Sequence, residues 1–216
     1  MSYGPDSELI NRYMPCYDMA ITEHLVIDHD REAVYMAARD LDFMSVKSPL
    51  LNASFFVRGL PARVTGKATP PPPALRLGEG DLGLPGWVYL GDIPGREVAF
   101  GAVGRFWKSD IEWRDVPVAD FAGFDEPGWG KIACHFLVTD DGPGRSVISY
   151  ECRTATTDLT ARRQMQRYWW VIRPFVGHVM RATLRTIRDT TRRVPAPAPA
   201  PSPTSASAEA PSSTPA

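Results

Sequence analysis

Residues 131–156 read KIACHFLVTDDGPGRSVISYECRTAT, and this stretch has the pattern of a β-hairpin. Two β-favouring runs, 131–139 and 146–156, flank the turn-forming sequence at 141–144. We therefore predict an antiparallel hairpin that is symmetric about Pro143. The cross-strand pairs that this register implies are Phe136–Tyr150, Cys134–Cys152 and Val138–Ile148.

Alternation along the hairpin predicts one apolar face and one polar face. Successive side chains of a strand point to opposite sides, so every second residue belongs to the same face. The pattern is typical of an antiparallel sheet that is covered on one side and meets solvent on the other. The apolar face would carry Ile132, Cys134, Phe136, Val138, Ile148, Tyr150 and Cys152, and the polar face His135, Ser149, Glu151 and Arg153.

A long amphipathic helix is predicted directly after the hairpin. Asp158 can cap its first turn, and apolar residues recur at steps of three and four from Met165 to Ile187. About 33 residues at 1.5 Å each would span roughly 50 Å. Pro174 removes an internal hydrogen bond and Gly177 follows, so we expect a kink or a break there.

The elements before the hairpin complete an α+β order. Residues 19–27 are predicted to form a first strand, and Asp28 or Asp30 can cap a short helix that runs to about Asp40. A second short helix would begin at Ser48-Pro49. The order predicts an α+β fold, in which a curved antiparallel sheet is covered on its apolar face by the long C-terminal helix, with two short helices after the first strand. Further β-rich runs are Trp87–Leu90, Glu97–Trp107, Ile111–Val116 and Ala119–Phe124.

Charge and composition describe one globular domain with a distinct tail. The 216 residues carry a net charge of -1, which divides into -7 over residues 1–157, +7 over 158–193 and -1 from Glu209 in the tail. We expect an N-terminal extension over 1–15, a folded domain over 16–193 and a disordered Pro-, Ala- and Ser-rich tail over 194–216. The sequence shows no secretory signal, no membrane-spanning run and too few cysteines for a disulfide scaffold, so we expect a cytoplasmic protein.

The sequence lacks the residue patterns that metal sites, nucleophilic catalysis and phosphate binding require. Four scattered histidines and no Cys-x-x-Cys pattern argue against a metal site, so no metal and no cofactor are expected. A Gly-x-Ser-x-Gly elbow is absent, and Gly101-Ala102-Val103-Gly104 lies inside a β-rich run rather than before a helix. Cys134 and Cys152 are interpreted as small buried hydrophobes.

Glu151 and Arg153 are the best candidates for acid–base work. They lie two residues apart and therefore share one strand face. The alternation places that face in solvent, where they would form an exposed ion pair. A shift of one residue in register would instead turn both side chains into the space between sheet and helix. There they could hold a polar ligand head or position a substrate carbonyl.

Several strings resemble the helix-grip superfamily, which includes the START lipid-transfer domains and the aromatic polyketide cyclases (SRPBCC proteins). The resemblance covers roughly residues 16–190 and is sharper to uncharacterised bacterial members. It departs from them at 28–31 and in a long Pro-rich insertion. It implies a hydrophobic or amphipathic small ligand between the sheet and the C-terminal helix. The strings are Ser48-Pro49-Leu50, Gly104-Arg105-Phe106-Trp107, Glu151-Cys152-Arg153, Thr157-Asp158 with Arg162, and the run 168–175.

We therefore expect a protein that binds a lipid- or polyketide-like molecule in an internal cavity, without catalysis. One alternative is a cyclase or dehydratase, acting as a lyase or isomerase, with Glu151 and Arg153 as catalytic residues. Another is an interaction module whose Arg-rich helix meets a membrane surface or a protein, although pairing of that helix with the acidic body is favoured. Nucleic acid is not an expected partner, and the oligomeric state stays open. The predicted ligand-binding residues are Phe100, Phe106, Phe136, Tyr150, Tyr168, Trp169 and Ile172.

Overall fold

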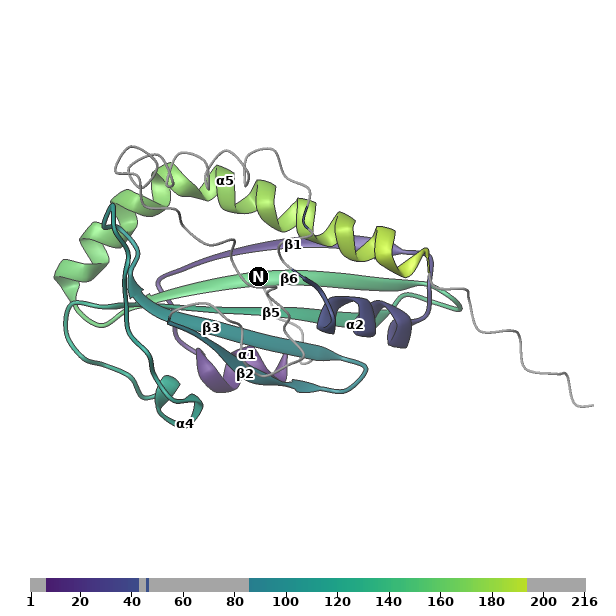
Figure 1. Ribbon diagram of the computed structural model, residues 1–216, viewed down its shortest axis with the longest axis horizontal. Coiled ribbons are helices and arrows are strands. Elements are labelled where there is room, and N and C mark those ends of the chain that lie inside the picture. The colour runs from purple at the N-terminus through teal and green to yellow at the C-terminus, as the bar shows by residue number, and fades with distance from the viewer. Residues whose placement is uncertain (1–6, 43–45, 47–85, 194–216) are drawn as a thin grey trace, which may run out of the picture.

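The computed structural model describes residues 7–42, 46 and 86–193. The helix expected from Ser48-Pro49 and the tail expected over 194–216 lie outside the described residues. The described part has the α+β, helix-grip arrangement that the sequence predicts, with a curved antiparallel sheet below one long C-terminal helix (Figure 1).

The central hairpin has the predicted register. Strands β5 (Gly130–Asp140) and β6 (Ser146–Thr156) pair antiparallel. The turn between them needs glycine, because Gly142 and Gly144 have φ angles of 103° and 64°. The predicted cross-strand pairs Phe136–Tyr150, Cys134–Cys152 and Val138–Ile148 are all confirmed.

The other strands extend this hairpin on both sides. Strand β1 (Met19–Ile27) pairs with β6, and β3 (Glu97–Arg105) pairs with β5. Strands β2 (Trp87–Ile93) and β4 (Glu112–Trp113) both pair with β3. The strand order is therefore β1-β6-β5-β3-β2, and β1 lies at one edge of the sheet.

Helix α5 (Leu159–Thr191) covers the concave face of the sheet. The Asp158 carboxylate caps it and accepts the N–H groups of Thr160 at 2.7 Å and Ala161 at 2.8 Å. The helix packs on β1, helix α2 (Arg31–Arg39) and β6, and much of its apolar stripe is buried there. It continues through Pro174, so the expected break does not occur, although its ribbon changes direction near the middle (Figure 1).

Helix α2 (Arg31–Arg39) closes one end of the concave side. It begins after Asp30 and ends at Arg39, as the sequence predicts, although the Asp30 side chain makes no capping hydrogen bond. Val34 and Ala38 are fully buried in the core between the sheet and α5. The first strand and the first short helix are thus both confirmed.

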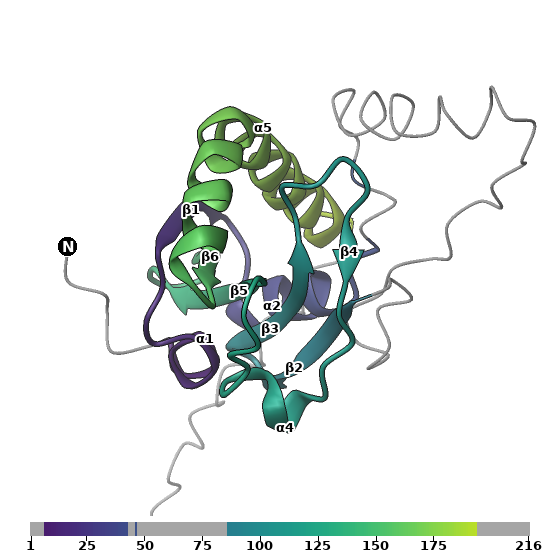
Figure 2. The ribbon, with the colours of Figure 1, turned by 90° about the vertical axis from the view of Figure 1, so that its left-hand side faces the viewer.

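The opposite face of the sheet is not left to solvent. Helices α1 (Glu8–Tyr13) and α4 (Val118–Phe121) lie on the side away from α5 (Figures 1 and 2). They form a second apolar cluster in which Leu9, Ile10 and Phe121 pack against Ala99 and Ala133 of the sheet. The prediction of a sheet covered on one side only was therefore wrong, because small residues at these sheet positions leave room for a helix.

The run 119–124 is also not the predicted strand. Residues 118–121 form α4, which follows Pro117 and buries Phe121 completely. A Cβ on Gly101 of β3 would lie 2.6 Å from the Phe121 ring, so only glycine leaves space for that ring. This single buried anchor holds the short helix against the sheet where a strand was expected.

Candidate functional site

An open cleft of about 1590 Å³ runs along edge strand β1 and the middle of α5. Met19 and Ile21 of β1 and Trp169 of α5 form its inner wall, and all three also belong to an apolar cluster at this end of the sheet. Trp170 and Arg173 also line the cleft, and because both side chains are exposed they belong to its solvent-facing rim. The cleft thus has an apolar base and a cationic, aromatic mouth.

The cleft wraps around β1 because no further strand pairs with its outer edge in the described part of the chain. Alternate residues of β1 face opposite sides of the sheet, and both sets line the cleft. On the side away from α5, His24 Nδ1 lies 2.7 Å from Ser149 Oγ on the neighbouring strand. This second part of the lining is polar, and it reaches His135 and Glu151.

Gly177 lies where α5 packs tightly against β1. A Cβ at this position would lie 3.2 Å from Ile21 Cδ1 and 3.3 Å from Glu23 Oε1. Beside it, Arg181 forms a 2.5 Å ion pair with Glu23. Helix and edge strand are therefore joined here by packing and by charge, and the cleft runs past this junction.

Three of the predicted ligand-binding residues pack against one another in the concave core. The ring centroid of Phe136 lies 4.5 Å from that of Tyr150 and 5.8 Å from that of Phe100. These side chains are between 1% and 7% exposed. None of the three lines the cleft beside β1, so the structure places them in the packed core.

The Tyr150 hydroxyl lies in this core near the two hairpin cysteines. Burial raises the pKa of Tyr150, and the neighbouring Cys134 and Cys152 thiols raise it further. Burial likewise raises the pKa of Cys134, whose thiol faces Cys152 across the hairpin. Both cysteines are buried and free, in agreement with their interpretation as small hydrophobes.

The remaining predicted residues gather at the first half of α5. Phe106, Tyr168, Trp169 and Ile172 belong to one apolar cluster with Trp113, whose ring lies 5.8 Å from Phe106. Tyr168 and Ile172 are only partly buried. Trp169 is the one predicted ligand-binding residue that also lines the cleft.

A buried hydroxyl next to this cluster has no hydrogen-bond partner. Thr154 is fully buried, and its Oγ1 is unpaired. Alternation along β6 puts it on the same face as Tyr150 and Cys152, and its cross-strand neighbours are Met19 and Ile132. An unsatisfied buried polar group is costly, so a partner supplied by a bound molecule would be favourable.

Glu151 and Arg153 are neither exposed nor directed toward α5. They are 3% and 1% exposed, and α1 covers them on the face of the sheet away from α5. The expectation of a solvent-exposed pair was wrong because the polar face is covered by a helix. The hairpin does not have the register shifted by one residue, so the prediction that Glu151 and Arg153 lie on the face away from α5 is correct.

Four charged side chains form a continuous buried network under α1. Arg153 Nε donates to Glu151 Oε1 at 2.7 Å, and His135 Nε2 lies 3.4 Å from Glu151 Oε2. His135 Nδ1 lies 2.6 Å from Glu97 Oε1. Both nitrogens of His135 thus face carboxylates, which favours the doubly protonated imidazolium form. The network then holds two positive and two negative charges.

Glu97 connects this network to the first helix. Its carboxylate accepts the backbone N–H groups of Glu8, Leu9 and Ile10 at 2.9, 3.0 and 3.2 Å. These are amide groups that the helix itself leaves unpaired, and a negative charge at a helix N-terminus is favourable. At the other end of α1, Arg153 donates to the Asn11 side chain and to the Met14 carbonyl.

The ionisation of the network follows from these contacts. Burial alone would raise the pKa of Glu97 and of Glu151, but hydrogen bonds from His135, the α1 amides and Arg153 outweigh it and lower both pKa values. Burial alone would lower the pKa of His135, but its hydrogen bonds to Glu151 and Glu97 raise that pKa. The groups hold one another in the charged state, which suits anchoring α1 better than proton transfer.

We predict that stability depends on pH through this network. The two carboxylates stabilise the fold fully above their usual pKa of 4.5, and this contribution is lost as the pH falls through their lowered values. His135 stabilises it fully below its usual pKa of 6.5, and its contribution is lost as the pH rises through its raised value. Urea unfolding should therefore show the greatest stability between about pH 4.5 and 6.5.

The variant His135→Gln shows how much of the loss of stability above pH 6.5 comes from His135 and not from other titrating groups. It should be less stable than the wild type at pH 6, and the difference should shrink as the pH rises, because the wild type then loses its imidazolium charge. A constant difference between the two proteins across this range would contradict a charged His135.

Sequence reasoning missed Glu97 and α1. A signal was present, because Leu9, Ile10, Tyr13 and Met14 recur at the spacing of a one-sided apolar helix. Nothing near Glu97 marks it as the partner of that helix, since the two lie 87 to 89 residues apart. A second missed cluster joins the hydroxyls of Tyr35 and Tyr89 to Asp92, and burial raises both tyrosine pKa values.

Residues 7–42, 46 and 86–193 contain no group of three or more His, Cys, Asp or Glu side chains that is placed to hold a metal ion. Within the same residues, no helix combines the length and the apolar character that crossing a bilayer requires.

Comparisons with known proteins add no family assignment. No family model and no curated protein matches the chain. Three crystal structures are similar at 10–12% identity, namely CalU16 from Micromonospora echinospora, TTHA0849 from Thermus thermophilus and Ara h 8.0201. They cover 81%, 81% and 82% of this chain and 84%, 98% and 99% of their own, with TM-scores of 0.28, 0.29 and 0.27. At these values the fold description rests on the strand order and helix placement given above.

Proposed function

We propose that this protein binds a small amphipathic molecule in the cleft between β1 and α5, without catalysing its conversion. The carrying observation is the cleft itself, with an apolar base of Met19, Ile21 and Trp169 and a rim that bears Arg173. Ligand sites are commonly concave and apolar, with a few polar groups that fix orientation. The lining has this character on the α5 side of β1.

The apolar base would take a hydrocarbon chain or a fused ring system. Trp169 offers a flat, largely buried surface and belongs to the partly buried cluster with Tyr168 and Ile172. Thr154 Oγ1 lies one strand further in, beside Met19, and could accept or donate one hydrogen bond. A ligand with one polar group along an apolar body would satisfy that hydroxyl.

The rim favours a negatively charged head group. Arg173 is exposed at the mouth and makes no ion pair with any described residue, whereas Arg181 is already paired with Glu23. An arginine can bind a carboxylate or phosphate with two parallel hydrogen bonds. The resemblance to the helix-grip superfamily supports the same role, in which a lipid- or polyketide-like molecule lies between sheet and helix.

Anilinonaphthalene sulfonate, an anionic aromatic probe, tests this proposal in solution. The wild type should bind it with enhanced fluorescence, and Arg173→Gln should weaken binding about tenfold because one charge-assisted contact is lost. The neutral probe Nile red should bind both proteins equally, since the apolar base is unchanged. Arg185→Gln is the matched control, because Arg185 is also exposed on α5 but does not line the cleft.

Native mass spectrometry of freshly purified protein provides a second readout. A co-purified mass lost on denaturation would support the proposal and give the class of ligand. Equal weakening of anilinonaphthalene sulfonate by Arg173→Gln and Arg185→Gln would place the probe outside the cleft and contradict the proposal.

A further inference from the structure

The outward face of α5 carries an apolar patch that the fold does not bury. Trp170 and Val171 are 83% and 71% exposed, and Leu159 at the start of the helix is 70% exposed. Arg163, Arg167 and Trp170 follow one another at steps of four and three, so they lie on the same side of the helix. We call Arg163, Arg167, Trp170, Val171 and Arg173 the Trp170 face.

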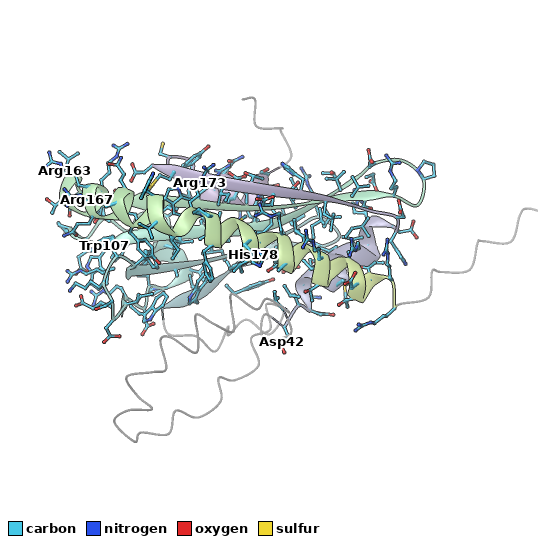
Figure 3. All side chains as sticks on the ribbon, turned by 90° about the horizontal axis from the view of Figure 1, so that it is seen from above. Asp42, Trp107, Arg163, Arg167, Arg173 and His178 are labelled. Atoms are coloured by element: carbon cyan, nitrogen blue, oxygen red, sulfur yellow. The ribbon has the colours of Figure 1, made fainter. Side chains whose placement is uncertain are left out.

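This face is positively charged, and no acidic side chain among the described residues pairs with its arginines. Residues 159–188 contain seven arginines and no Asp or Glu. Arg162 and Arg181 reach Asp18 and Glu23 beside β1, and Arg188 pairs with Asp189. Arg163, Arg167 and Arg173 are exposed and make no ion pair with described residues. Figure 3 places Arg163 and Arg167 at the first turns of α5 and Arg173 on the side of β1. Pairing with the acidic body therefore accounts for only part of the basic helix.

We propose that the Trp170 face docks on an anionic lipid bilayer surface. Tryptophan is favoured at the membrane–water interface, where its ring meets the acyl boundary and its N–H meets the head groups. Arginines beside it would contact lipid phosphates, and the absence of acidic residues over 159–188 makes the face complementary to a negative surface. The apolar side chains and the unpaired charges thus fit one partner.

The Trp170 face lies next to the mouth of the cleft, which links docking to ligand binding. Trp170, Val171 and Arg173 line the cleft as well as belonging to the exposed patch. Docking through these residues would bring the mouth of the cleft to the head-group region, where an amphipathic molecule could pass between bilayer and protein. This inference rests on the proposed function only in taking the cleft as the ligand site. Binding of the Trp170 face to lipid is tested without any ligand.

Vesicle co-sedimentation tests the inference with the full chain. Vesicles of an equimolar mixture of phosphatidylcholine and phosphatidylglycerol should bind the wild type, and vesicles of phosphatidylcholine alone should bind it far less. The double variant Arg163→Gln/Arg167→Gln should bind about 25-fold more weakly, at about fivefold for each basic residue near the surface. Trp170→Gln should weaken binding roughly tenfold through lost apolar burial. Binding should also fall with salt.

Arg185→Gln serves as the control that removes one positive charge from the second half of α5. It should bind the mixed vesicles within about twofold of the wild type. Circular dichroism and unfolding curves should be unchanged for all of these exposed substitutions, so that a loss of binding cannot be attributed to misfolding.

Three outcomes would overturn the inference. One is equal binding to neutral and anionic vesicles, and another is binding that Trp170→Gln leaves unchanged. The third is a wild type that elutes as a dimer without lipid while Trp170→Gln elutes as a monomer, because the face would then bind a second copy. A wild type that binds anilinonaphthalene sulfonate but not the mixed vesicles refutes docking alone, and a wild type that binds these vesicles but not the probe refutes the cleft alone.

Discussion

Replacing Glu97 by alanine is expected to lower the free energy of unfolding by about 4 kcal/mol, the typical cost of removing one partner of a buried ion pair. Glu97 is fully buried and holds His135 together with three backbone amides of α1. Without the Glu97 carboxylate, those three backbone N–H groups lose their hydrogen-bond acceptor, and their buried position limits replacement of that acceptor by water. His135 would also keep a carboxylate on one nitrogen only.

The loss of stability in Glu97→Ala should be concentrated in α1. Amide hydrogen exchange at Leu9 and Ile10 should become fast in Glu97→Ala, because the first turn of α1 would open without global unfolding. Glu112→Ala is the matched control, since Glu112 pairs with Arg105 and Lys108 at the surface. Urea unfolding should separate the two variants clearly. Equal midpoints for Glu97→Ala and Glu112→Ala would contradict a structural role for the network.

Replacing Phe136 by alanine is expected to cost roughly 4 kcal/mol, as for other fully buried aromatic side chains. Phe136 is 1% exposed and contacts the rings of Tyr150 and Phe100 on the concave face. Phe136→Leu retains most of the volume and should cost much less. Unfolding curves in urea measure both, and the difference between them reports the space that the ring fills.

The same variants separate packing from ligand binding. Phe136 does not line the cleft beside β1, so Phe136→Leu should bind anilinonaphthalene sulfonate as tightly as the wild type. A stable Phe136→Ala protein, within about 1 kcal/mol of the wild type, would indicate that this ring lines open space. That result, combined with weaker binding of anilinonaphthalene sulfonate, would indicate that the ligand binds at the centre of the concave face, around Phe136.

Local rules predicted a large part of the fold. The register of the hairpin follows from glycines at 142 and 144 and from alternation, which are both properties of neighbouring residues. The start of α5 follows from the Asp158 side chain and a stripe that must face the sheet. The first strand and the helix after Asp30 were predicted for similar reasons. These elements needed no knowledge of distant contacts.

What the sequence could not predict depends on contacts between distant segments. The burial of Glu151 and Arg153 requires α1, which lies about 140 residues earlier in the chain. Whether an alternating strand has one or two covered faces depends on such additional elements. The candidate site shows the same limit, because the apolar stripe of α5 identified Trp169 as inward-facing but could not show that β1 would be an open edge.

If a small amphipathic molecule binds beside β1 and α5, a nitrogen–proton NMR titration should show it at individual tryptophan side chains. The indole N–H signals of Trp169 and Trp170, assigned with single variants, should shift on addition of anilinonaphthalene sulfonate, because both residues line the cleft. The Trp129 indole, bonded to Glu126 outside the cleft lining, should stay in place. Shifts at Trp129 with none at Trp169 or Trp170 would contradict the account.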